Sequence, residues 1–284
     1  MLNWLTARTD GSEEGEMSFL DHLEELRWHL IRSVGAILVF SIVAFFSKKF
    51  IFHDLILAPA RPDFWTYIKL CQLAQVLDQP FLCIEKLNFI IQNRSMTGQF
   101  STHITVSFVV GLVVGFPYFF WEMWRFIKPG LYPRERNLTR GAVFFVSSLF
   151  FSGVLFGYYV LAPLSINFLA NYQVDETIDN QIDLLSYIQI LVMMVLACGL
   201  MFQLPMVIYV LAKGGIVSAQ FLRTYRKHAI IIILFIAAIL TPSPDVFSQL
   251  IVFLPIYTLY EISIFLTLTV EKQKVQEELA ERQG

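Results

Sequence analysis

Charged residues are scarce in this chain of 284 residues. Only 15% of the residues are Asp, Glu, Lys or Arg, whereas 56% are hydrophobic, and the mean hydropathy is +0.60. A soluble domain of this size carries about a quarter charged residues. The scarcity of charge therefore excludes a soluble globular protein and indicates an integral membrane protein with no separate globular domain.

The sequence also lacks the motifs of the common enzyme classes. It contains no metal-ligand spacing, nucleophile elbow, phosphate-binding loop or dinucleotide fingerprint, and its five histidines are scattered. We therefore expect a protein that is not an enzyme, has no catalytic residues and uses no metal or cofactor. An internal repeat is lacking as well, which argues against a secondary transporter assembled from repeated halves.

Long apolar runs, in contrast, are abundant. A helix that crosses about 30 Å of hydrocarbon needs roughly 20 apolar residues. Four runs are near this length or longer: 28–46, 104–121, 141–162 and 184–211. A fifth run, 229–240, covers only about 18 Å as a helix, and a sixth, 246–268, follows it after a short turn. The predicted fold is an all-α polytopic membrane protein with six transmembrane helices, the last two forming a hairpin with one short arm.

Prolines occur inside three of these runs. Pro117, Pro205 and Pro255 each remove one intrahelical hydrogen bond, which tends to kink a helix. Several bent helices favour a concave bundle over a straight cylinder. The alternative is that neighbouring helices satisfy the freed carbonyls and the prolines are simply tolerated.

Lys and Arg are distributed unevenly among the connecting segments. They occur before the first run, after the second, after the fourth and in the C-terminal tail, whereas 163–183 and 241–245 contain none. The remaining Lys and Arg lie in the segment 47–99, and long loops cross membranes despite their charges. The positive-inside rule therefore predicts a multi-pass protein of the bacterial cytoplasmic membrane with both termini in the cytoplasm.

The two ends of the chain are polar. Residues 1–17 are rich in Glu, Gly and Ser and are expected to be disordered, whereas residues 271–284 are expected to form a charged cytoplasmic tail. The first 27 residues lack a basic stretch followed by an apolar one, so we expect no cleavable signal peptide. Residues 18–270 then form the membrane domain.

Two of the three cysteines, Cys71 and Cys83, lie in the long outer segment. This segment is too long for a plain connection and is expected to form short helices that cap the bundle. In an oxidising compartment the two cysteines can form a disulfide, and otherwise they are two free, small apolar residues. Cys198 lies inside the fourth run, where a packing role is expected.

Two clusters of charge lie just outside the apolar runs, on the same predicted face. Glu24 and Glu25 precede the first run, and Glu135 lies within an Arg-Glu-Arg sequence before the third. These carboxylates can bind a cationic peptide, or they can serve as ordinary caps, because a carboxylate also stabilises a helix N-terminus. The residues by themselves leave both interpretations open.

Polar residues inside the apolar runs are rarer. Gln203 is ten residues, or about 15 Å, from Lys213 at the inner end of the fourth run, so it lies near mid-bilayer. A buried amide at that depth needs partners and indicates either a functional polar site or an interhelical hydrogen bond. Glu261, inside the sixth run, is expected to face a cavity, a partner helix or a cation.

Taken together, several stretches resemble the TatC family, the largest integral subunit of the twin-arginine protein translocase. They occur in the family's order: Phe19–Arg27, Trp124–Tyr132 with Glu135, Phe202–Pro205, and Leu240–Gln249. The resemblance implies a receptor that binds twin-arginine signal peptides at the cytoplasmic surface. With single-span partners of the TatA and TatB type, such a receptor moves folded proteins across the membrane using the proton motive force.

The resemblance also implies roles for individual residues. Glu25 and Glu135 match the two carboxylates that bind the arginine pair. The side chains expected to shape that site are Arg27, Arg136, Trp124, Phe126, Pro129 and Leu131. The residues expected to form an intramembrane polar or partner-docking region are Gln203, Pro205, Asp245, Gln249 and Glu261. The complex is expected to be homo-oligomeric in a lipid bilayer, with no nucleic-acid partner.

Several positions depart from the family pattern. His29 and Asn137 replace residues that are often basic, and Gln203 replaces a frequent glutamate. An amide cannot ionise, although it can still donate and accept hydrogen bonds. The turn at 241–245 is also one residue longer than expected.

The two alternative functions are a secondary transporter for a small solute and a purely structural membrane scaffold.

Overall fold

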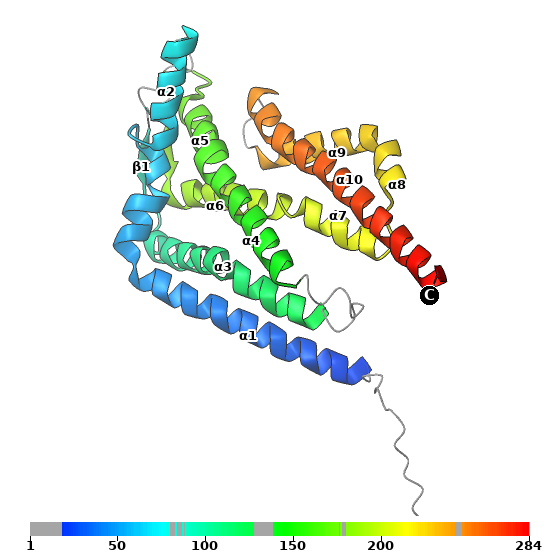
Figure 1. Ribbon diagram of the computed structural model, residues 1–284. Helices are drawn as coiled ribbons and strands as arrows, with labels where there is room; N and C mark the ends of the chain where they lie inside the picture. The colour runs from blue at the N-terminus through cyan, green and yellow to red at the C-terminus, as the bar shows by residue number, and fades with distance from the viewer. Residues whose placement is uncertain are drawn as a thin grey trace, which may run out of the picture.

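The computed structural model describes residues 19–79, 83, 87, 89–127, 139–175, 177, 180–241 and 246–283. Helices account for nearly all of this part of the chain (Figure 1). The disorder predicted for residues 1–17 lies outside the described residues.

Each membrane-spanning segment is either one long helix or a series of consecutive shorter helices. Their bounds are α1 Phe19–Phe46, α3 Gly98–Ile127, α4 Thr139–Phe156, η6 Gly157–Leu161, α5 Ala162–Asn171, α6 Leu184–Met201, α7 Leu204–Lys213 and α10 Val246–Gln283. Two shorter helices, α8 Ala219–Thr224 and α9 Arg226–Leu240, connect α7 to α10. In Figure 1, α9 and α10 lie side by side as a hairpin.

Five segments in the described residues are long and apolar enough to cross a membrane: Glu24–Phe46, Gly98–Phe126, Gly141–Asn171, Leu184–Lys213 and Ser248–Gln276. The remaining helix, α9, has 15 residues and is therefore about 22 Å long. The chain is thus an all-helical polytopic membrane protein, as predicted. The fifth predicted span, α9, is short, as expected, although a polar first turn extends it beyond the apolar residues that the hydropathy pattern identified.

Most helices extend beyond the apolar runs that predicted them. The first begins at Phe19 instead of residue 28, and α10 continues to Gln283 through the segment expected to be a separate tail. Hydropathy identifies only the part of a helix that lies in hydrocarbon. The residues after 270 are mostly Glu, Gln, Lys, Leu and Ala, which favour helix in water as well.

The prolines act differently from one another. Near Pro205 the fourth span is interrupted between α6 and α7 at Phe202 and Gln203, whereas Pro117 and Pro255 lie inside continuous helices. The third span is interrupted instead by the π-helical turn η6, with Pro163 at the start of α5. A proline therefore breaks the helix in only one of the three predicted cases, and the concave shape stays a prediction.

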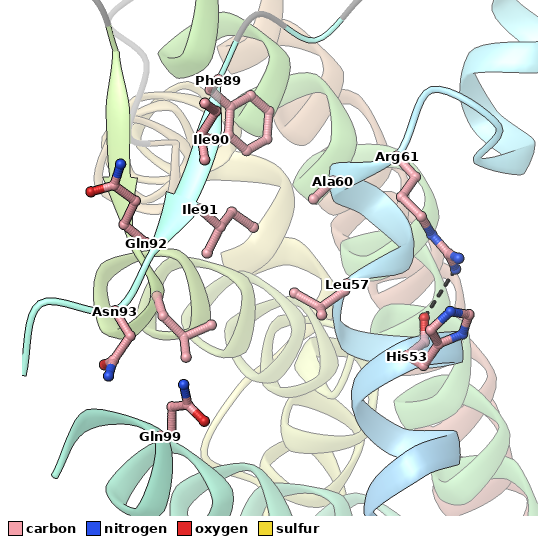
Figure 2. Close-up of a pocket in the computed structure, with 11 residues that line it drawn as sticks. His53, Leu57, Ala60, Arg61, Phe89, Ile90, Ile91, Gln92, Asn93 and Gln99 are labelled. Carbon is pink, nitrogen blue, oxygen red and sulfur yellow. Dashed lines mark hydrogen bonds between the residues drawn. The ribbon is translucent and has the colours of Figure 1, made fainter. Parts of the chain in front are cut away.

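The described part of the segment 47–99 forms a cap of short elements at one end of the bundle. It contains η1 Phe50–Ile56, η2 Ala58–Ala60, α2 Trp65–Leu77 and β1 Ile90–Gln92. The strand β1 pairs in parallel with β2 Gln181–Asp183, a two-stranded sheet that the hydropathy pattern does not reveal. A disulfide joins Cys71 and Cys83. Between η1, η2 and β1 lies a cavity of about 530 Å³, shown in Figure 2, where Arg61 Nη2 donates to the His53 carbonyl.

Tyrosine hydroxyls attach this cap to the bundle. Tyr158 donates to the Leu55 carbonyl at 2.6 Å, and Tyr187 donates to the Ile56 carbonyl at 2.7 Å. These two carbonyls lie at the end of η1, where helical partners are missing. Tyr67 is 1% exposed, and burial raises the pKa of its hydroxyl, which keeps it protonated as a donor.

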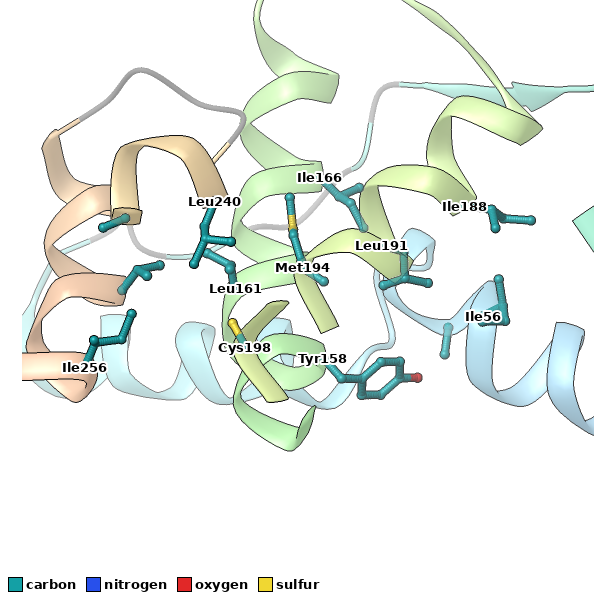
Figure 3. Packing of buried hydrophobic residues seen from close by; sticks show 14 of the residues in the cluster. Ile56, Tyr158, Leu161, Ile166, Ile188, Leu191, Met194, Cys198, Leu240 and Ile256 are labelled. Atoms are coloured by element: carbon teal, nitrogen blue, oxygen red, sulfur yellow. The ribbon is translucent and has the colours of Figure 1, made fainter. Parts of the chain in front are cut away.

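The hydrophobic core is centred on α6. Figure 3 shows its side chains packed between the third span and the α9–α10 hairpin. Cys198 is a free, buried cysteine within this cluster, as a packing role predicts. Glycines permit close approach here: a Cβ added at Gly153 would lie 2.5 Å from the Cys198 carbonyl oxygen. The third and fourth spans therefore pack nearly backbone to backbone.

Candidate functional site

The candidate site lies at the end of the bundle where α1 begins and α3 ends. These two helices run antiparallel along their length, as Figure 1 shows. Gly111 permits the close crossing, because a Cβ there would lie 2.6 Å from the Ser41 backbone nitrogen. The antiparallel packing places the charged N-terminal turns of α1 beside the aromatic C-terminal turns of α3.

Glu25 is the carboxylate of α1 that this packing presents at the site. Its side chain is 38% exposed, and Oε1 lies 3.9 Å from Nε2 of His29, one helical turn further along. Arg27 and Glu24 are exposed on the same turn of α1. Glu25 therefore combines solvent access with a buried neighbour that restricts one side of its carboxylate.

Behind Glu25 lies a buried ionisable pair that hydropathy reasoning did not identify. His29 Nδ1 is hydrogen-bonded to Glu122 Oε2 across the α1–α3 contact, and the two residues are 6% and 1% exposed. Tyr118 donates to Glu122 Oε1 at 3.0 Å, and a guanidinium nitrogen of Arg125 lies 3.9 Å from the same oxygen. A glutamate near the end of an apolar run was the available signal, since ionisable groups at such positions need partners.

Aromatic side chains surround this pair. Phe126 meets the His29 ring edge to face, with ring centroids 6.2 Å apart. Trp124 is 8% exposed and packs in a small cluster with Val146 and Met206. Trp124 therefore supports the site from within the bundle, whereas Phe126 lies next to the buried pair.

Four predicted site residues lie outside the described residues: Pro129, Leu131, Glu135 and Arg136. The structure therefore places Glu25, Arg27, Trp124 and Phe126 at this end of the bundle. The second predicted carboxylate, Glu135, belongs to the segment between α3 and α4 that lies outside the described residues.

Among the described residues of the predicted intramembrane group, Gln203, Gln249 and Glu261 are each bonded to a different partner and not to one another. Gln203, at the α6–α7 break, donates from Nε2 to the Val146 carbonyl of α4 at 3.2 Å. Within the part of the chain that the structure describes, its buried Oε1 has no hydrogen-bond partner. Pro205 is buried, and Gln249 donates to the Leu234 carbonyl at 2.9 Å between α10 and α9. Asp245 lies outside the described residues.

Glu261 faces a cation on a neighbouring helix. Its Oε2 accepts from Nη2 of Arg226 at 2.7 Å, and its Oε1 accepts from the Tyr257 hydroxyl at 2.8 Å. Arg226 begins α9 and Glu261 lies on α10, so this contact fastens the two arms of the hairpin. The residue has a structural partner, which accounts for a carboxylate inside an apolar run.

Among the described residues, no group of three or more His, Cys, Asp and Glu side chains is placed to hold a metal ion. The cavity of Figure 2 contains none of the predicted site residues. The groups described at the candidate site are the exposed Glu25 carboxylate, the buried His29–Glu122 pair, the cations Arg27 and Arg125, and aromatic rings; the exposed carboxylate is the group that suits a cationic segment.

Comparisons with known proteins agree with this geometry. The family described as Sec-independent protein translocase protein (TatC) matches residues 21–255. A TatC protein of Blattabacterium is 38% identical over 265 residues, covering 93% of this chain and 99% of the relative. One of Carboxydothermus hydrogenoformans is 33% identical, covering 89% and 94%. A crystal structure titled as the twin-arginine translocase receptor TatC in DDM is 30% identical, has a TM-score of 0.67 and covers 87% of this chain and 99% of its own.

Proposed function

Because this chain belongs to the TatC family and is a receptor component of the twin-arginine translocase, we propose that Glu25 and Glu135 together bind the arginine pair of the signal peptide. A translocase subunit of this family is a non-enzymatic transport component. Membership in the TatC family therefore rules out the two alternative functions, a small-solute transporter and a purely structural scaffold.

The observation that carries the proposal is the position of Glu25. Its carboxylate is 38% exposed near the start of α1, beside the end of α3, and Glu135 follows α3 in the sequence. A guanidinium is a planar fork that matches a carboxylate through two parallel hydrogen bonds, whereas an ammonium is a point charge. Two adjacent arginines therefore need two acceptors, for which we propose Glu25 and Glu135.

Orientation and partners form the second part of the proposal. The distribution of Lys and Arg supports a cytoplasmic location for both termini, in the bacterial inner membrane. The signal-peptide site then faces the cytoplasm, where precursor proteins are made. Single-span subunits of the TatA and TatB type, and further copies of this chain, complete the complex that uses the proton motive force.

The intramembrane docking point for such a partner is Gln203. Its Oε1 is buried with no hydrogen-bond partner among the described residues, so it can accept one from a polar residue of an incoming helix. Gln203→Leu should impair co-purification of the single-span partners more than peptide binding. A selective loss of peptide binding in Gln203→Leu would contradict this assignment.

The test of the carboxylate pair is peptide binding to the full chain in lipid nanodiscs. Glu25→Gln and Glu135→Gln should each weaken binding of a twin-arginine peptide about tenfold, since a hydrogen bond to a charged group contributes about 1.5 kcal/mol or more. Glu24→Gln is the matched control, because Glu24 is an exposed neighbour of the same chemistry. Equal affinities for the wild type and both variants would show that neither carboxylate binds the arginine pair.

A further inference from the structure

We propose that His29 and Glu122 are positioning residues that hold the Glu25 carboxylate in the orientation needed for a bidentate arginine. The inference rests on the proposed function, in which Glu25 binds a signal-peptide guanidinium. It assigns a role in Arg-over-Lys selectivity to a buried pair that does not itself contact the peptide.

The burial of this pair requires an explanation. Two ionisable side chains that are 6% and 1% exposed are costly to remove from water unless their polar atoms are satisfied. Both oxygens of Glu122 have partners: His29 on Oε2, and Tyr118 with the nearby Arg125 on Oε1. Glu122 is therefore enclosed by its own neighbours and is not a third acceptor for the peptide.

The geometry links the buried pair to Glu25. Because Nδ1 of His29 is hydrogen-bonded to Glu122, the ring orientation is set from α3, and Nε2 is the nitrogen that faces outward. This Nε2 lies 3.9 Å from Oε1 of Glu25. Phe126 packs against the ring from α3 as well. The imidazole is thus held in one orientation, and it limits the positions that Oε1 of Glu25 can take.

The two residues of α1 are correctly spaced for this contact. Glu25 and His29 are four positions apart, so they lie on the same face of the helix one turn from each other. His29 in turn is hydrogen-bonded to Glu122 of α3. His29 therefore links the Glu25 carboxylate at the surface to α3.

Restricting the Glu25 carboxylate strengthens the binding of arginine more than the binding of lysine. A bidentate contact requires both carboxylate oxygens in one plane, whereas an ammonium binds a carboxylate from many directions. Immobilising a side chain that is free before binding costs about 0.5 to 1.5 kcal/mol, and a Glu25 carboxylate held in advance avoids this cost. Loss of the buried pair should thus weaken arginine binding about three- to tenfold and change lysine binding much less.

The experiment measures the affinity of the full chain in nanodiscs for twin-arginine peptides and for versions with one arginine replaced by lysine. The readout is the ratio of the two affinities. His29→Gln and Glu122→Gln should each lower this ratio about three- to tenfold. A fraction of misfolded protein lowers the number of binding sites without changing the ratio, so a merely structural role would leave it unaltered.

Two further variants complete the set. His103→Gln makes the same substitution at the other end of the α1–α3 contact, where His103 Nε2 is bonded to the Phe45 carbonyl, and it should leave the ratio unchanged. Tyr118→Phe removes one donor to Glu122 and should lower the ratio in the same direction, which keeps the inference testable if a variant of the pair fails to insert.

The outcomes separate this inference from the proposed function. If Glu25→Gln abolishes the preference for arginine while His29→Gln, Glu122→Gln and Tyr118→Phe keep the wild-type ratio, the positioning role is wrong and the function stands. If Glu25→Gln itself keeps the wild-type ratio, the proposed function is wrong. A fall in the ratio for His103→Gln equal to that for His29→Gln would also overturn the inference.

Discussion

Gly111 lets α1 and α3 approach more closely than any side chain would permit. A Cβ built there would lie 2.6 Å from the backbone nitrogen of Ser41 and 2.8 Å from its Cα, whereas ordinary contact begins near 3.4 Å. The Ser41 hydroxyl also meets this Cβ and can rotate away, but the backbone atoms cannot. Gly111→Ala therefore forces the two helices apart at their crossing.

The size of the effect follows from two opposing contributions. Overpacking in a close contact costs about 1 to 3 kcal/mol. Alanine in place of glycine stabilises a helix by about 1 kcal/mol. The net loss is therefore up to about 2 kcal/mol, which lowers the Tm of a chain of this size by at most roughly 4 to 8 °C.

Thermal unfolding of the purified protein in detergent, followed by tryptophan fluorescence, measures this change. Gly35→Ala is the matched control, since it makes the same substitution in α1 where no heavy atom lies within 4 Å of the added Cβ. Its Tm should be equal to or above that of the wild type. If Gly111→Ala were as stable as Gly35→Ala, the close crossing of α1 and α3 would be refuted.

Three further changes test other contacts. Cys71→Ser removes a disulfide between positions separated by 12 residues, so unfolding of the cap should become easier by about 3 kcal/mol, measured by hydrogen exchange of α2 under oxidising conditions; unchanged exchange would contradict it. Arg226→Gln should lower the Tm, because it leaves the Glu261 carboxylate without its cation inside a membrane span; an unchanged Tm would show that the hairpin does not depend on this pair. Glu271→Ala removes the acceptor of the Ala219 backbone N–H, so trypsin should cleave the α8 region faster, and an unchanged cleavage rate would argue against that contact.

Much of the fold could be predicted because a bilayer imposes a simple requirement on sequence. Apolar runs of sufficient length must be helices, so hydropathy located the long spans and showed that the run ending at Leu240 was too short. The helix ends were predicted less well, as Phe19 and Gln283 show, since hydropathy does not register helix that continues in water.

The site was only partly predictable. Glu25 could be found because it lies in a recognisable stretch at the start of a span. Glu122 could not be assigned a partner, because the residue it bonds, His29, is 93 positions away and looked like a local departure from a family pattern. The parallel pairing of β1 with β2 was also not predicted, because three residues are too few to show the alternating pattern of a strand.

The sequence by itself determined the membrane class, the positions of the spans and the family, because each follows from local composition or from residues in a fixed order. Only the tertiary structure decided which charged groups are buried together and which remain accessible. Burial and hydrogen bonding depend on the antiparallel contact of α1 with α3, and that contact joins residues which no local pattern connects. The physical reason is that a pair such as His29 and Glu122 is stable only when packing supplies all of its partners at once.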